Sequence, residues 1–165
     1  MRPASRKRQR MRVPKNPLAR AGSHRGATAI EAAIVLSGLF VVLFGMLDLG
    51  LGILEFNTLA EASRRLCRQA IVHGQNASPS MTAWGPESVS GTAADSTAYA
   101  QALSPELATF NLSNVKYTIN WPDDSNQYDS RVEVIVTYQY QPLMPFIFGT
   151  AGVPLQAVTT MHVEH

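Results

Sequence analysis

A long uncharged apolar run constrains the fold of this chain more than any other feature. Residues 32–47 carry no charge over 16 positions, which cover about 24 Å as an α-helix. Extension to residue 54 adds Asp48 and gives 23 residues, about 35 Å, enough to cross a bilayer with some tilt. Because a cleaved secretory signal has a shorter apolar core and a small-x-small cleavage site, the run predicts a membrane-spanning helix.

Charge is distributed unevenly on the two sides of this run. Nine of the 14 Lys and Arg residues lie at or before Arg25, and the first acidic residue is Glu31. From Gly26 onward, five basic residues face all 12 acids, a net charge of −7. Basic residues that flank a span stay in the cytoplasm, whereas nucleic-acid binding by this tail has only its charge in favour. We therefore expect a basic cytoplasmic leader (1–26), a transmembrane helix (27–54), an exported helix extension (55–74) and a small exported α+β domain (75–165), held in a bacterial inner membrane.

Glu31 stands about one helical turn inside the span. An acid at the centre of a bilayer costs about 2.5–3.5 kcal/mol, and less near the edge. Either Glu31 reaches back to the cytoplasmic interface, or it meets a positive charge supplied after insertion. A cut after Gly26 would supply one, because the new N-terminal amine would belong to Ala27 and Glu31 would become the fifth residue.

Glycines recur on the same side of the helix as this glutamate. Gly38, Gly45 and Gly52 follow Glu31 at steps of seven residues, which drift only about 20° per step around a straight helix. Asp48 lies beside this stripe. Small residues let helix backbones approach closely in lipid, so the stripe predicts helix packing, although glycines are also common in membrane helices for other reasons.

Three sequence patterns carry a resemblance to a known family. Residues 25–31 read Arg-Gly-Ala-Thr-Ala-Ile-Glu, residues 45–50 read Gly-Met-Leu-Asp-Leu-Gly, and residues 59–70 form an Ala- and Arg-rich helical segment. Together they resemble the TadE-like proteins, which are minor pilins or pseudopilins of the tight-adherence (type IVc) pilus. The chain departs from the family pattern at Ala32, where an aromatic residue is common, at Ser37, near a common proline, and at Leu49, which replaces an aromatic residue.

The resemblance implies a structural role. It implies cleavage after Gly26 by a prepilin peptidase, pairing of Glu31 with the freed amine of a neighbouring subunit, and assembly into a pilus or its base. The implied partners are that peptidase, other pilin or pseudopilin subunits, the inner-membrane assembly platform and the lipid bilayer. Neither catalysis nor a cofactor is implied, and we expect no nucleic-acid partner.

The rest of the chain predicts an α+β domain. Leu59, Ala62, Leu66 and Ala70 form an apolar stripe that extends the helix, and Gly74 is a natural stop. Residues 75–95 read as a loop, and residues 96–103 as a short helix. Alternating residues predict strands at 115–121, 132–140 and 155–163. We expect an antiparallel sheet of about three strands packed on the exported half of the helix, and an apolar loop at 143–154 that includes Phe146, Ile147 and Phe148.

No pattern for a site of chemistry stands out. Asp123, Asp124, Asn126 and Asp129 cluster in one turn, but they lack the glycine and final glutamate of an EF-hand loop, so a solvated turn is favoured over a calcium site. Cys67 has no second cysteine and is expected to be a small buried thiol. The sequence has no common catalytic motif.

Two other functions stay open at this point. The chain could be an uncleaved single-span anchor that holds a periplasmic binding domain. It could also be a secreted enzyme whose mature form begins well after residue 54.

Overall fold

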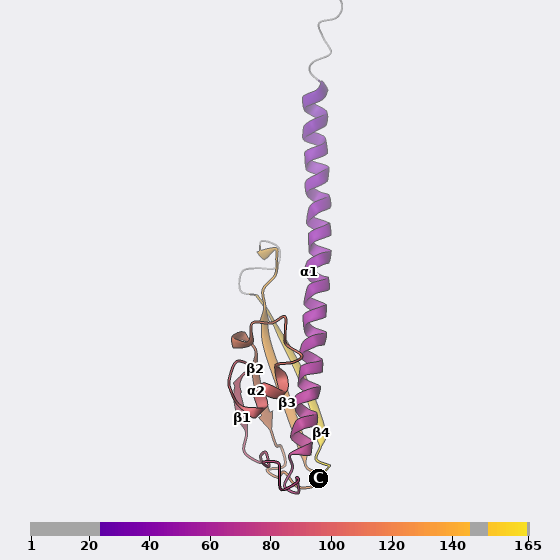
Figure 1. Ribbon diagram of the computed structural model, residues 1–165. Coiled ribbons are helices and arrows are strands. Elements are labelled where there is room, and N and C mark those ends of the chain that lie inside the picture. Colours follow the sequence, from indigo (N-terminus) through magenta and orange to yellow (C-terminus); the bar gives the residue numbers. More distant parts are fainter. Residues whose placement is uncertain (1–23, 146–151, 165) are drawn as a thin grey trace, which may run out of the picture. The chain divides into compact units, whose positions relative to one another are not determined.

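The computed structural model describes residues 24–145 and 152–164, which form one long helix and a small sheet domain (Figure 1). The chain divides into two compact units, with the boundary between Val41 and Val42. Most of the basic leader and the predicted loop residues Phe146, Ile147 and Phe148 lie outside the described residues. The elements in chain order are α1 (His24–Val72), β1 (Val89–Thr92), α2 (Ala98–Leu103), η1 (Leu112–Asn114), β2 (Lys116–Asn120), β3 (Arg131–Tyr140) and β4 (Val153–His162).

The first unit consists of α1 up to Val41 and is apolar on all its sides. Its large side chains, such as Ile30, Ile34 and Leu39, are exposed. A helix that is apolar all round requires an apolar environment. Helix α1, of which this unit is the first part, is long and apolar enough to cross a membrane.

The second unit holds the sheet, which pairs its strands in chain order. β1, β2, β3 and β4 are all antiparallel to their neighbours. The β3–β4 pair is the longest and runs from Arg131 opposite His162 to Tyr140 opposite Val153. Alternation is clear on β3, where Val132, Val134 and Val136 are buried, so one face of the sheet lies on a core.

The C-terminal part of α1 covers this face. Four apolar residues at helical spacing, Leu59, Ala62, Leu66 and Ala70, are fully buried in the core shared with the sheet, which confirms the predicted stripe. A polar contact also joins the two layers, since the hydroxyl oxygens of Ser63 on α1 and Thr159 on β4 lie 2.7 Å apart. The α+β class and the packing of a long helix on an antiparallel sheet are thus confirmed.

The sheet has one strand more than we expected. β1 lies within residues 75–95, which the sequence suggested were loop. Its four residues, Val89-Ser90-Gly91-Thr92, pair with β2 from Val89 opposite Ile119 to Thr92 opposite Lys116. So short a segment shows no clear alternation, and its extended form depends on the neighbouring strand.

Candidate functional site

Asp48 is the most unusual residue in the second unit because it is a buried acid on an otherwise apolar part of α1. It is 1% exposed. Its carboxylate accepts hydrogen bonds from the Tyr140 hydroxyl, from the backbone N–H of Leu143 at 3.1 Å and from that of Met144 at 3.2 Å. A buried carboxylate is tolerated when it is hydrogen-bonded in this way. We call Asp48, Tyr140, Leu143 and Met144 the carboxylate junction.

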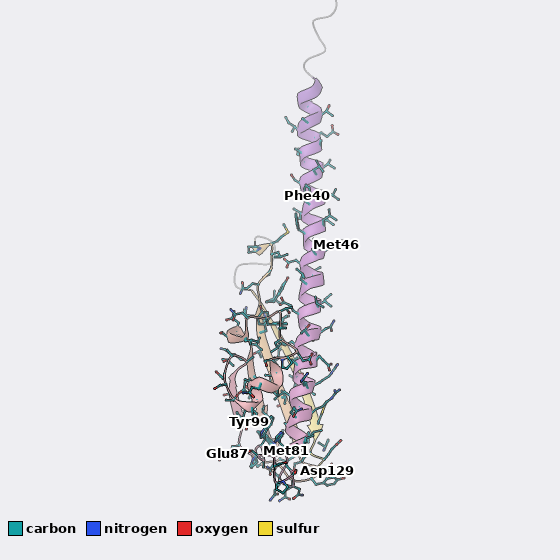
Figure 2. All side chains as sticks on the ribbon, viewed as in Figure 1. Phe40, Met46, Met81, Glu87, Tyr99 and Asp129 are labelled. Atoms are coloured by element: carbon teal, nitrogen blue, oxygen red, sulfur yellow. The ribbon has the colours of Figure 1, made fainter. Side chains whose placement is uncertain are left out.

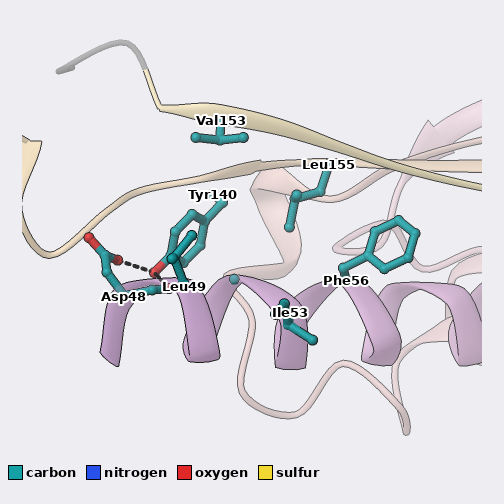
Figure 3. Close-up of a pocket in the computed structure, with 8 residues that line it drawn as sticks. Asp48, Leu49, Ile53, Phe56, Tyr140, Val153 and Leu155 are labelled. Carbon is teal, nitrogen blue, oxygen red and sulfur yellow. Dashed lines mark hydrogen bonds between the residues drawn. The ribbon is translucent and has the colours of Figure 1, made fainter. Parts of the chain in front are cut away.

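Tyr140 brings the end of β3 to the helix. Figure 3 shows its ring reaching from the strand towards α1, with its hydroxyl at Asp48. The same hydroxyl lies 3.1 Å from the backbone carbonyl oxygen of Asp48. Burial and the hydrogen bond to the Asp48 carboxylate both raise the pKa of Tyr140 above its ordinary value, so this phenol stays protonated and remains a donor. The junction therefore fixes the position along α1 at which the sheet meets the helix.

A groove opens next to the junction, between α1 and the edge of the sheet. It has a volume of about 290 Å³. Apart from Asp48 and the hydroxyl of Tyr140, its lining is apolar and comes from α1, the end of β3 and β4 (Figure 3). The lining residues are Asp48, Leu49, Gly52, Ile53, Phe56, Tyr140, Val153 and Leu155.

The chain contains a recognisable family segment on the same helix. Residues 26–68 match the family model described as TadE-like protein. This segment is TadE-like. It begins at Gly26, contains Glu31 and Asp48, and ends within the part of α1 that packs on the sheet. No curated protein and no solved structure gave a significant match to the chain.

The first residues of the TadE-like segment lie in the opening turns of α1. Gly26 and Ala27 follow the helix start at His24, and both are exposed. Glu31 is one turn further on and is also exposed, with apolar Ile30 and Ile34 around it. These three residues therefore lie within the first turns of the helix.

The glycine stripe of the TadE-like segment has two different surroundings. A Cβ atom at Gly52 would lie 3.6 Å from the Tyr140 ring, so this glycine faces the chain's own sheet. A Cβ atom at Gly38 or Gly45 would meet nothing within 4 Å among the described residues. Close approach by another helix is therefore open at Gly38 and Gly45, whereas Gly52 contributes to the packing of Tyr140.

Sequence reasoning found Asp48 but not its partners. Its place beside the glycine stripe predicts a helix-packing residue, whereas in the structure its carboxylate binds groups of the chain's own domain. Tyr140, Leu143 and Met144 are 92–96 positions away, and two of the three bonds come from backbone groups, which leave no trace in the residue types. A polar-tipped tyrosine at the end of a predicted strand was the one signal available.

The turn that holds Asp123, Asp124, Asn126 and Asp129, which we call the aspartate turn, lies at the end of the β3–β4 pair opposite the carboxylate junction. Asp123 accepts a hydrogen bond from the Arg131 backbone N–H at 2.9 Å and forms an ion pair with its guanidinium at 2.6 Å. Asp129 lies 3.3 Å from the His162 ring. Within the described residues, no group of three or more His, Cys, Asp or Glu is arranged to hold a metal ion. The turn thus ties strand ends together.

Cys67 is the small buried thiol that its place in the helix predicted. It has no exposed surface, and its sulfur lies 3.6 Å from the Val132 carbonyl oxygen. Burial raises the pKa of the thiol to about 11. A thiol in this state is a poor nucleophile at neutral pH, which agrees with a packing role.

The TadE-like segment and the membrane-length apolar helix together support a membrane protein related to the tight-adherence pilus. One helix of this kind among the described residues supports single-pass anchoring. The junction and the groove supply packing and hydrogen bonds but no arrangement of nucleophile, base and acid.

Proposed function

We propose that this protein is a pilin-like or pseudopilin subunit of a tight-adherence pilus or of its assembly base. The observation that carries the proposal is the TadE-like match, which begins at Gly26, at the head of an exposed apolar helix. In this proposal a prepilin peptidase cuts after Gly26 on the cytoplasmic side. The domain of residues 75–165 is exported, and α1 joins the subunit to others and to the inner-membrane platform.

Assembly would then rest on one pair of charges. After the cut, the amine of Ala27 is free, and Glu31 of a neighbouring copy or sister subunit lies within the same layer of lipid. Each charge alone is costly in hydrocarbon, and pairing removes much of that cost. The open surroundings of Gly38 and Gly45 allow the helices to approach closely while the pair forms.

The exported domain has a structural role in this proposal. Its hydrogen-bonded groups join strands to one another or to α1, as at the carboxylate junction and the aspartate turn. It would present a surface, and α1 would hold that surface in place. The alternative is an uncleaved single-pass anchor for a periplasmic binding domain, which needs neither the cut nor the charge pair.

Replacement of Glu31 tests the proposal directly. We expect Glu31→Ala and Glu31→Gln to enter the membrane at wild-type levels but to be missing from sheared filaments or from large detergent-extracted assemblies. Glu61→Ala is the matched control, because Glu61 is an exposed acid whose ion pair, at 3.4 Å to Arg64, lies within α1 itself. Normal assembly of both Glu31 variants would contradict the charge pair, and absence of the wild-type chain itself from any assembly would favour the simple anchor.

A further inference from the structure

The carboxylate junction lies where the membrane span must end. In the second unit, the α1 residues just before Asp48 include Val42, Met46 and Leu47, which are apolar and exposed; Met46 projects outward from the helix in Figure 2. Residues 27–47 cover about 31 Å as a helix, close to the roughly 30 Å of a bilayer's hydrocarbon core. Asp48 therefore comes at the outer edge of that core.

Hydrogen bonds hold the end of β3 beside Asp48, at the same position along α1. The Tyr140 hydroxyl and the N–H groups of Leu143 and Met144 all donate to the Asp48 carboxylate. Backbone groups can enter an apolar layer only when they are paired within the protein, and here the carboxylate pairs them. The Leu143 side chain itself is 63% exposed, a large apolar group beside a span.

The apolar surface continues past the junction without a break. Leu49, Ile53 and Phe56 on α1 are exposed, and they line the groove together with Val153 at the start of β4. The nearest carboxylate, that of Asp48, is turned inwards and buried. This surface is thus a direct extension of the lipid-facing side of α1 onto the sheet domain.

We propose that this surface, formed by Leu49, Ile53, Phe56 and Val153, is a second membrane contact, together with the exposed Leu143 that follows β3. It seats the domain in the outer interfacial layer of the bilayer. The partner is lipid, because the surface is continuous with the span and its polar groups are paired within the chain. The proposal rests on the membrane insertion in the proposed function. It adds that the domain lies on the bilayer before assembly and does not hang from it on a free helix.

Spin labels at single cysteines test this contact in the full chain reconstituted in phosphatidylcholine vesicles. The test sites are Leu143→Cys and Val153→Cys. Val158→Cys is the water-exposed control, since Val158 is 52% exposed on the same strand as Val153, and Val42→Cys is the lipid control within α1. The wild-type chain, whose Cys67 is buried, gives the background. Power saturation then compares the access of oxygen, which concentrates in lipid, with that of a water-soluble nickel chelate.

We expect oxygen to be favoured over nickel at Leu143 and Val153, as at Val42, and nickel to be favoured at Val158. Nickel access at Leu143 and Val153 equal to that at Val158 would overturn the membrane contact and leave the span intact. If oxygen and nickel are both excluded at Leu143 and Val153, a second protein copy covers the surface, and the lipid proposal is also overturned. Nickel access at Val42 would instead show that the membrane insertion itself is wrong.

Discussion

At the scale of single residues, Asp48 links the apolar helix to the sheet. Its carboxylate is the common acceptor for one side chain and two backbone groups that come from the end of β3 and the residues after it. Glu55, seven residues later, differs because its Oε2 atom is buried and has no hydrogen-bond partner among the described residues. The two acids have the same spacing from the glycine stripe, and only one has a full set of donors.

Loss of the Asp48 carboxylate should loosen the domain. Asp48→Ala leaves the Tyr140 hydroxyl and two partly buried N–H groups without their acceptor. We expect it to lower the free energy of unfolding by about 3 kcal/mol, at about 1 kcal/mol for each group, the low end of the cost of a buried group left unsatisfied. Tyr140→Phe removes one donor and should cost less than Asp48→Ala. Denaturant unfolding followed by the fluorescence of Trp84 and Trp121 measures both. Wild-type stability of Asp48→Ala would contradict the role of the junction.

The aspartate turn should respond to acid. The Arg131 guanidinium and backbone N–H lower the pKa of Asp123 to about 2 from the ordinary value of 3.8. Because the folded-state pKa is the lower one, the stabilisation is present above about pH 4 and is lost as the pH falls towards 2. Carboxyl NMR titration should show the low pKa, and Arg131→Gln should move it back up. A wild-type pKa near 4 would contradict the ion pair.

At the scale of elements, Gly45 on the glycine stripe and Gly50 off it offer a matched comparison. Gly45→Leu places a large side chain on the proposed packing stripe, whereas Gly50→Leu places it about 140° away around the helix. A Cβ atom at either position meets nothing within 4 Å among the described residues, so both variants should fold normally. We expect Gly45→Leu alone to reduce helix association, measured by cross-linking in membranes. Equal association of the two variants would show that the stripe has no packing role.

Regular elements could be predicted from the sequence because each has a strong local period. The apolar positions of α1 from Leu59 to Ala70 and the alternating residues of β2, β3 and β4 were found within a few residues of their ends. β1 was missed, since its extended form depends on pairing with β2. The partners of Asp48 were missed for the same physical reason, because long-range contacts to backbone groups have no local signature.

At the scale of the whole molecule, a single element, α1, provides both the membrane-length apolar segment and part of the core of the sheet domain. α1 is apolar all round at its start and has one buried face where it packs on the sheet. The TadE-like segment, from Gly26 to residue 68, includes both the part of α1 that is apolar all round and the part that packs on the sheet. In the function that we propose, such a chain is inserted, trimmed after Gly26 and packed by its helix while its domain keeps one structure.

The N-terminal sequence of the protein purified from native membranes tests the central claim most directly. Our account predicts a mature chain that begins Ala27-Thr28-Ala29-Ile30-Glu31, and it predicts that Gly26→Ala stops this trimming while Gly50→Ala does not. Recovery of the wild-type protein with residues 1–26 still attached would contradict the account.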